Sequence, residues 1–407
     1  MASSSRDIFE EMLEEMFEST LYESMEQIVN EEFENLFVNR QQPTRSKKKR
    51  VYIERDREDG HNRLWNDYFC ENATYPHHLF RRRFRMNKPL FMRIVTRLAN
   101  EVPFFQQRRD ATGRFGLSGL QKATAAIRMM AYGCAADAVD EYLRLGESTA
   151  ISCLENFVEG IINLFGDEYL RKPTPQDLQR LLDIGEMRGF PGMIGSIDCM
   201  HWEWKNCPTA WKGHSNDINV LDKSPVFDNI LQGRAPKVNF FVNGHEYHLA
   251  YYLTDGIYPK WSTFIQSISL PQTPKASLFA TLQESVRKDV ERAFGVLQAR
   301  FAIVKNPALI WDKVKIGKIM RACIILHNMI VEDERDGYTQ FDVSEFAQVE
   351  SSRSSHVDFM YSTDMPSNTG NLMAIRTRLR DRNIHEQLKN DLVEHIWRKF
   401  GTRQNNY

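Results

Sequence analysis

Apolar residues recur at helical spacing through the first half of the chain. An apolar stripe that returns every three to four residues marks the buried face of a helix, so this pattern predicts an all-α region over residues 62–190. One helix opens at Asn87 and carries Pro89 in its first turn, a position that favours proline. Five helices are expected, within residues 86–98, 120–132, 135–143, 147–165 and 173–188.

The segment Asp140–Phe157 has the form of a helix-turn-helix. A first helix ends, Gly146 turns the chain, and a second helix opens with small polar residues. In DNA-reading units of this form the start of the second helix enters the major groove, which would place Ser148, Thr149 and Ser152 against the bases. The alternative is an ordinary helical hairpin that makes no DNA contact, and the residues leave both interpretations open.

In the second half, two predicted strands each end at an aspartate. Met193–Ile197 is apolar and small, as in a central strand, and Asp198 follows it. A second strand, Tyr247–Leu253, is entered by an Asn-Gly turn and is followed by Asp255. Glu291 lies beside an apolar stripe on a later helix. Three converging carboxylates are the ligands that a catalytic pair of Mg²⁺ or Mn²⁺ ions about 3.5–4 Å apart requires.

The second acid has an alternative. Asp217 begins an apparent helix, where an aspartate is a natural N-cap, whereas a metal ligand belongs on a rigid strand end. Asp255 is therefore preferred over Asp217. Lys205, Lys212 and Arg287 are candidate phosphate contacts, which would make DNA binding depend on salt.

Charge is distributed unevenly although the formal net charge is only −1. Residues 1–42 hold eleven acidic residues against two basic ones, among apolar residues at helical spacing, which predicts an acidic amphipathic helix. The compact run Arg45–Arg50 is typical of a nuclear-import signal or a phosphate-contacting arm, and Arg81, Arg82, Arg83 and Arg85 add further positive charge. A polyanion partner and a nuclear location are expected.

Other compositional features exclude several classes of protein. The six cysteines include no C-x-x-C pair, which argues against a structural zinc site and against a disulfide framework. No run of 18 apolar residues and no signal peptide is present, so a soluble intracellular protein is expected.

Several sequence words together resemble one family. These are S-I-D-C-M-H-W-E-W, N-D-I-N-V-L-D, Y-Y-L-T-D-G-I-Y-P, R-A-F-G-V-L-Q-A-R-F and C-I-I-L-H-N-M-I-V-E-D. In this order they are similar to the plant PIF/Harbinger-type transposon proteins and to the nucleases derived from them, within the DDE superfamily. The resemblance covers roughly residues 60–335. It implies an RNase H-like fold with a five-stranded mixed sheet, and DNA cleavage by a divalent-metal site at Asp198, Asp255 and Glu291. It also raises the prospect of a separate Myb-like companion that binds DNA.

One departure from this family falls between His214 and Ser215. There the family carries the second and third strands of its sheet, which need on the order of 15 residues or more, and this chain has none. The first strand would lose a neighbour, and Asp198 would rest on an unsupported element. Because catalysis needs placement within about 0.5 Å, activity is expected to be impaired.

The expected organisation is an α/β fold preceded by an all-α region, and two functions remain open. One is a transposase-derived DDE endonuclease acting on DNA. The other is a catalytically inactive nuclear protein associated with DNA or chromatin. The expected segments are an acidic helix or tail (1–42), a basic linker (43–61), the helical region (62–190), a truncated RNase H-like domain (191–335), a flexible linker (336–370) and a C-terminal helix (371–407).

Overall fold

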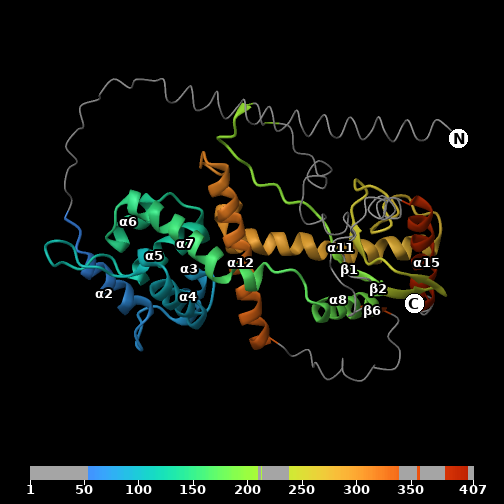
Figure 1. The fold of residues 1–407 in the computed structure, drawn as a ribbon, viewed down its shortest axis with the longest axis horizontal. Coiled ribbons are helices and arrows are strands. Elements are labelled where there is room, and N and C mark those ends of the chain that lie inside the picture. Colours follow the sequence, from blue (N-terminus) through green and yellow to red (C-terminus); the bar gives the residue numbers. More distant parts are fainter. Residues whose placement is uncertain (1–53, 210–211, 213–237, 339–354, 358–380, 402–407) are drawn as a thin grey trace, which may run out of the picture. The chain divides into compact units, whose positions relative to one another are not determined.

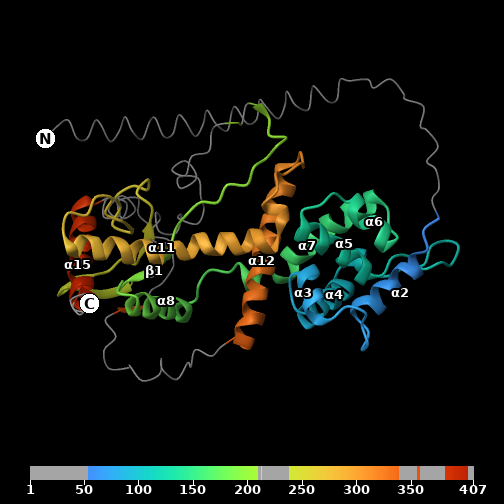
Figure 2. The same ribbon diagram turned by 180° about the vertical axis from the view of Figure 1, so that it is seen from behind.

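The structure is a computed structural model that describes residues 54–209, 212, 238–338, 355–357 and 381–401 (Figures 1 and 2). Apart from Glu54, the described residues belong to one unit of the chain, Arg55–Tyr407. The predicted acidic helix, the basic run Arg45–Arg50, the alternative acid Asp217 and most of the predicted linker at 336–370 lie outside the described residues.

The first half of the second unit is helical, as its apolar spacing predicts. Asn87 is the N-cap of α4 and proline occupies the first turn of that helix. Helix α5 begins with a capping box, in which Ser118 and Gln121 satisfy each other's backbone N–H groups. The helices are α2 (Arg57–Tyr68), α3 (His77–Phe84), α4 (Lys88–Glu101), η1 (Pro103–Phe105), α5 (Gly119–Tyr132), α6 (Asp137–Leu143), α7 (Glu147–Tyr169) and α8 (Pro175–Met187).

A cluster of aromatic rings joins α2, α3 and α4. Phe80 and Phe84 are stacked with their ring centroids 4.2 Å apart, and Phe91 lies 4.9 Å from Phe84. Phe69 meets Phe80 edge to face at 5.5 Å. Such pairs add roughly 0.5–1.5 kcal/mol to the free energy gained by burying the rings. These buried aromatic residues therefore form one part of the core of the helical region.

Six short strands are described, and they form two separate sheets. Strands β1, β4 and β5 are parallel in the order β1-β4-β5, whereas β2 pairs antiparallel with both β3 and β6. Within the described part of the chain, β1 lies at the edge of its sheet. The strands are β1 (Met193–Ser196), β2 (Val238–Val242), β3 (His245–Tyr247), β4 (Tyr251–Thr254), β5 (Phe264–Gln266) and β6 (Ser355–Val357).

The predicted single strand Tyr247–Leu253 is wrong. Within this stretch, β3 ends at Tyr247 and a separate strand, β4, begins at Tyr251. The Asn243-Gly244 turn has positive φ at both residues and closes the β2–β3 hairpin, as its sequence indicates. After the hairpin the chain enters the other sheet, where the Tyr251 N–H donates to the carbonyl of Gly192 at 3.1 Å. The described strands thus do not form one five-stranded sheet, and an RNase H-like fold remains a proposal.

Three long helices complete the described chain: α11 (Pro274–Arg300), α12 (Lys313–Tyr338) and α15 (Arg382–Phe400), with the short η3 (Ala302–Val304) after α11. Helix α11 contacts β1, β4, α15 and α12 (Figure 1). Helix α12 packs on α7, so both halves of the sequence contribute to one hydrophobic core. From the second half this core includes Leu297, Phe301, Ala322, Cys323, Leu326 and Met329. A second core contains residues of α8, of the strands and of α15, and the predicted boundary near residue 190 stays a prediction.

No helix among the described residues is both long and apolar enough to span a membrane.

Helix α15 is tied to the two sheets by polar side chains as well as by its buried Leu388, Leu392 and Ile396. Asp391 accepts hydrogen bonds from Tyr247 Oη at 2.5 Å, from His245 Nδ1 at 2.8 Å and from Asn243 Nδ2 at 3.1 Å. Burial raises the pKa of Asp391, but these three hydrogen bonds outweigh it and leave the pKa below the ordinary value.

The buried His385 of the same helix makes stability depend on pH. Gln266 uses its Nε2 to donate to the carbonyls of Tyr258 and Pro259, so its Oε1 accepts from His385 Nε2 at 2.9 Å. Burial, helped by the nearby lysines Lys389 and Lys260, lowers the pKa of His385 to about 4.

A lowered histidine pKa means that protonation favours the unfolded chain. The stabilisation by neutral His385 is complete above the ordinary pKa of about 6.5 and is lost as the pH falls toward 4. When the pH is lowered from 7 to 5, protonation of His385 should lower the free energy of unfolding by roughly 2 kcal/mol. Urea titration of the wild type and of His385→Gln at both pH values measures it, because only the wild-type difference contains this contribution. Equal pH dependence in the two proteins would contradict the assignment.

Candidate functional site

The first two predicted acids follow neighbouring parallel strands at the same level. Ser196 of β1 lies opposite Leu253 of β4, and the Ile197 N–H donates to the Leu253 carbonyl at 2.9 Å. Asp198 and Asp255 each come two residues after this pair. The carboxyl ends of β1 and β4 therefore present one aspartate each at the same edge of the sheet.

Helix α11 brings a row of polar side chains to this edge, spaced four residues apart. Gln283 is fully buried and its Nε2 donates to the carbonyls of Thr254 and Ile265 at 3.1 Å each, which fixes the helix to the ends of β4 and β5. One turn later Arg287 lies at the end of β1, and Glu291 follows after another turn. The row follows from helical geometry, since residues four apart share a face.

Arg287 connects the first and last predicted acids. Its Nη1 lies 2.7 Å from Glu291 Oε1 and 3.6 Å from Asp198 Oδ2. The Arg287 side chain is 15% exposed, that of Asp198 22% and that of Glu291 43%, so the ion pairs are partly shielded from water. In the structure the Arg287 guanidinium pairs with carboxylates, and the phosphate contact that the sequence predicts for it stays a prediction. The four-residue spacing from Glu291 is the signal that could have predicted this pair.

Tyr258 and Cys199 link the two strand ends. The Cys199 N–H donates to Asp198 Oδ1 at 2.8 Å, and the Cys199 thiol lies 3.3 Å from the Tyr258 hydroxyl. The Tyr258 N–H in turn donates to the Asp255 carbonyl at 3.3 Å. The Asp255 carboxylate itself is exposed and accepts from the N–H of Gly256. Tyr258 had no role in the sequence analysis, and nothing in its local pattern distinguishes it.

The arrangement does not fit a two-metal centre. Aspartate and glutamate oxygens are the donors that Mg²⁺ and Mn²⁺ prefer. Within the described ranges, however, no three His, Cys, Asp or Glu side chains are grouped so that they could hold a metal ion. The positive charge between Asp198 and Glu291 belongs to Arg287. Asp217, the alternative ligand, lies outside the described residues.

The segment after Asp198 leads to the connection between α11 and α12. Trp202 Nε1 donates to the Asn306 carbonyl at 2.8 Å, and Trp204 Nε1 donates to the Ile310 carbonyl at 2.7 Å. Lys205, one of the candidate phosphate contacts, is exposed on this segment, and Lys212 is exposed seven residues later. Neither is among the ion pairs that surround Asp198, so the structure does not assign them to the acidic cluster.

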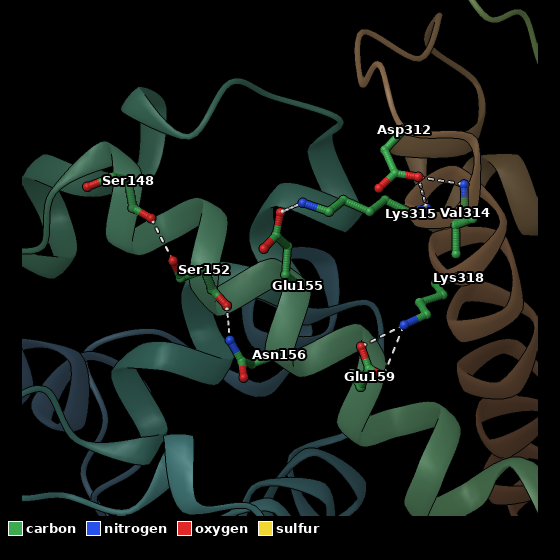
Figure 3. Close-up of polar contacts among 9 residues, drawn as sticks. All are labelled: Ser148, Ser152, Glu155, Asn156, Glu159, Asp312, Val314, Lys315 and Lys318. Carbon is green, nitrogen blue, oxygen red and sulfur yellow. Dashed lines mark hydrogen bonds and ion pairs between the residues drawn. The ribbon is translucent and has the colours of Figure 1, made fainter. Parts of the chain in front are cut away.

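Helices α6 and α7 occur where the helix-turn-helix form predicts them. Arg144 ends α6 in the left-handed conformation, and Gly146 is the N-cap of α7. Ser148 is exposed and Thr149 is half-buried on the first turn of α7, while Ser152 Oγ donates to the Ser148 carbonyl at 3.0 Å (Figure 3). Two helices and a turn do not define a DNA-reading unit, so a DNA contact by these residues stays a prediction.

The next two turns of α7 contact α12 through ion pairs (Figure 3). Glu155 pairs with Lys315 at 2.7 Å, and Glu159 pairs with Lys318 at 2.9 Å. Exposed ion pairs of this kind contribute about 0–1 kcal/mol each, so the apolar contacts beneath them do most of the packing. What they do settle is that α12 covers this face of α7.

Comparison with known proteins gives the class of this chain. A family model described as plant transposon protein matches residues 167–215 and 213–338, and a model described as a domain of unknown function matches residues 60–99. The chain is also similar to proteins named putative nuclease HARBI1 from rat, cattle and human, at 22%, 23% and 22% identity over 234 residues. Each alignment covers 47% of this chain and 63% of the relative, so less than two thirds of the relatives' length is spanned. No solved structure matches significantly.

These similarities relate the chain to transposon proteins and to proteins named as nucleases. Over residues 167–338, the chain is similar to the Harbinger-derived family. The two parts of the family match meet at residues 213–215, so the match is interrupted where the sequence analysis located the missing segment, between His214 and Ser215.

Proposed function

We propose that this protein binds duplex DNA through a frame derived from a nuclease and does not cleave it. The observation that carries the proposal is the Arg287 guanidinium held against both Asp198 and Glu291. A cation fixed at this point supplies the charge neutralisation that the two carboxylates otherwise seek from a metal ion. Asp255 is exposed after the end of β4, and among the described residues no ion pair joins it to Asp198 or Glu291.

DNA is proposed as the ligand because the similar proteins are named as nucleases and the family as transposon proteins. Charge supports it: residues 62–128 hold thirteen lysines and arginines against four acidic residues. Basic residues that are exposed bind the phosphate backbone with little regard to base sequence and release counterions on binding. A nuclear location is proposed for the same reasons, with the run Arg45–Arg50 as the import signal. A Myb-like companion and chromatin partners remain predictions from the resemblance.

A second candidate is phosphodiester cleavage that depends on Mg²⁺ or Mn²⁺. The register of β1 and β4 favours it, because Asp198 and Asp255 follow the paired strands at the same level. It requires that Arg287 leave the carboxylates and that Glu291 approach both aspartates. RNase H-like topology is part of this second candidate.

Purified protein with a labelled DNA duplex and Mn²⁺ separates the two candidates. We expect salt-sensitive binding, and nicking no faster than that of Asp198→Ala, since the metal ligands are not assembled. Nicking by the wild type that Asp198→Ala abolishes would establish the second candidate instead. Absence of binding at low salt would refute the proposed function.

Arg287→Gln provides a readout that does not depend on activity. Without the guanidinium, Asp198 and Glu291 lose their counter-charge, so Mn²⁺ binding measured by calorimetry should exceed that of the wild type. Arg292→Gln is the matched control, because this arginine is on the same helix and pairs with Asp289 instead. Equal Mn²⁺ affinity in all three proteins would mean that Arg287 does not take the place of a metal.

A further inference from the structure

Two segments that are far apart in the sequence lie side by side next to the start of α12 (Figures 1 and 2). We define the paired segments as residues 202–206 and 306–311. The Ala308 N–H donates to the Glu203 carbonyl at 2.8 Å, and the Lys205 N–H donates to the Ala308 carbonyl at 3.1 Å. The two indole hydrogen bonds described above and one hydrogen bond from a side-chain amide add to these contacts. The backbone of each segment is therefore fixed by the other.

Exposed and buried side chains alternate along the paired segments. Ala308 is 5% exposed and Ile310 is half-buried, whereas Leu309 is 62% exposed and Trp311 is 76% exposed. On the other segment, Lys205 is exposed between two half-buried neighbours. In extended backbone, successive side chains point to opposite faces. Lys205, Leu309 and Trp311 therefore belong to the outer face of the paired segments.

Trp311 is the largest side chain of this outer face. Among the described residues, no other Trp, Tyr or Phe side chain is as exposed. Val314, three positions later on the first turn of α12, is 66% exposed. The backbone after the ring is fixed by Asp312, whose Oδ1 accepts from the Val314 N–H at 2.8 Å and from the Lys315 N–H at 3.3 Å (Figure 3). Adjoining apolar side chains that remain exposed on an ordered surface indicate a binding site.

The charge around Trp311 favours an anionic ligand. Residues 199–212 and 302–320 together hold six lysines against two acidic residues. One of the two acids is Asp312, which is engaged by the N–H groups at the start of α12. Lys205 and Lys305 are exposed, and within the described ranges neither forms an ion pair. A nucleic-acid strand matches both properties of this surface, because its bases stack on aromatic rings and its phosphates pair with lysines.

From this we infer that the outer face of the paired segments binds unpaired nucleotides of DNA, with Trp311 stacked on a base and Lys205 and Lys305 in contact with the phosphates. Bases within a duplex are already stacked on one another, so an indole ring reaches the face of a base only where the strand is unpaired. The inference rests on the proposed DNA-binding function and adds to it a preference for DNA with single-stranded ends. The sequence predicts a phosphate contact for Lys205, but it gives no role to Trp311 or Lys305.

Fluorescence anisotropy of the full chain with two labelled DNAs tests the inference. Both DNAs have the same duplex sequence, but one is blunt and the other carries a short oligothymidine overhang. We expect the wild type to bind the overhang DNA roughly 10- to 100-fold more tightly, since stacking on an aromatic side chain contributes to binding for each base.

Two substitutions at Trp311 separate stacking from apolar contact. Trp311→Leu keeps an apolar side chain but has no aromatic face, so it should lose most of the preference for the overhang DNA and bind the blunt duplex like the wild type. Trp311→Phe keeps a ring and should retain the preference to within about threefold. A protein partner that contacts Trp311 only through its apolar surface would distinguish these two variants little.

A double lysine variant tests the phosphate contacts. Lys205→Gln/Lys305→Gln should lower the slope of log K against log salt for the overhang DNA by about 1.4, because each contact with a single strand contributes about 0.7. Lys172→Gln/Lys288→Gln is the matched control, in which two lysines exposed elsewhere, before α8 and on α11, are replaced. The control should keep the preference of the wild type for the overhang DNA.

The two DNAs distinguish failure of the inference from failure of the proposed function. Equal affinity of the wild type for both DNAs, or a preference that Trp311→Leu retains, would overturn the inference and leave the outer face to a protein partner. Binding of the overhang DNA without binding of the blunt duplex would support the inference and refute the proposed duplex binding. Circular dichroism and unfolding midpoints of all variants should match the wild type, because the substituted side chains are exposed.

Discussion

Replacing Gly192 with alanine is expected to lower the free energy of unfolding by roughly 2–5 kcal/mol. Gly192 has a φ of +82°, and a Cβ atom there would lie 2.5 Å from the buried Phe240 ring. The substitution therefore combines backbone strain with an overlap that the ring has no room to relieve. The two sheets approach each other here, since Gly192 precedes β1 and Phe240 belongs to β2.

Gly244→Ala is the control for this experiment. Gly244 also has a positive φ, +90°, but a Cβ there would meet no atom within 4 Å. Only the strain of the left-handed backbone remains, which costs about 1–2 kcal/mol. Urea unfolding of both variants isolates the overlap with Phe240 as the difference. Equal destabilisation would show that the chain at Gly192 moves away from Phe240 without cost.

Phe84→Ala is expected to destabilise the protein by about 3–5 kcal/mol, the usual cost of removing a fully buried aromatic ring. Phe84 has no exposed surface, is stacked on Phe80 at 4.2 Å and lies 4.9 Å from Phe91. The cavity cannot close easily, because its walls are other rings held by α2 and α4. Thermal and urea unfolding measure the loss.

Phe115→Ala makes the same chemical change on an exposed ring. Phe115 is 46% exposed and lies in the loop between η1 and α5, outside the aromatic cluster, so the expected loss is below about 1 kcal/mol. A loss at Phe115 as large as that at Phe84 would mean that the aromatic cluster is not the stabilising core of the helical region.

Local signals in the sequence were enough to predict several elements of the fold. Asn87, the alternation of apolar residues in α5 and the Asn243-Gly244 turn each act over a few residues, and the structure has a helix start, a buried helix and a hairpin at these positions. The strand ends before Asp198 and Asp255 follow from equally local apolar runs. The ends of helices and strands depend on caps and turns. The residues that form a cap or a turn lie within a few positions of one another in the sequence.

Pairings between distant segments were not predicted. Whether Tyr247 and Tyr251 share a strand depends on which sheet each joins, and β2, β6 and β1 decide this from elsewhere in the chain. The role of Arg287 depends on Asp198, which is 89 positions away and reaches it only through the packing of α11 on β1. A search of the sequence for metal-ligating residue types finds Asp198 and Glu291, but it does not reveal that the Arg287 guanidinium pairs with both.

The shared core of α7 and α12 has a consequence for how this lineage can change. The family match begins at residue 167, inside α7, so the inherited transposon segment and the helical region meet within a single helix. A deletion that removed the helical region would leave Ala322, Leu326 and Met329 of α12 without their partners. Selection that preserves the packing of either part therefore acts on both, because the two parts share one hydrophobic core.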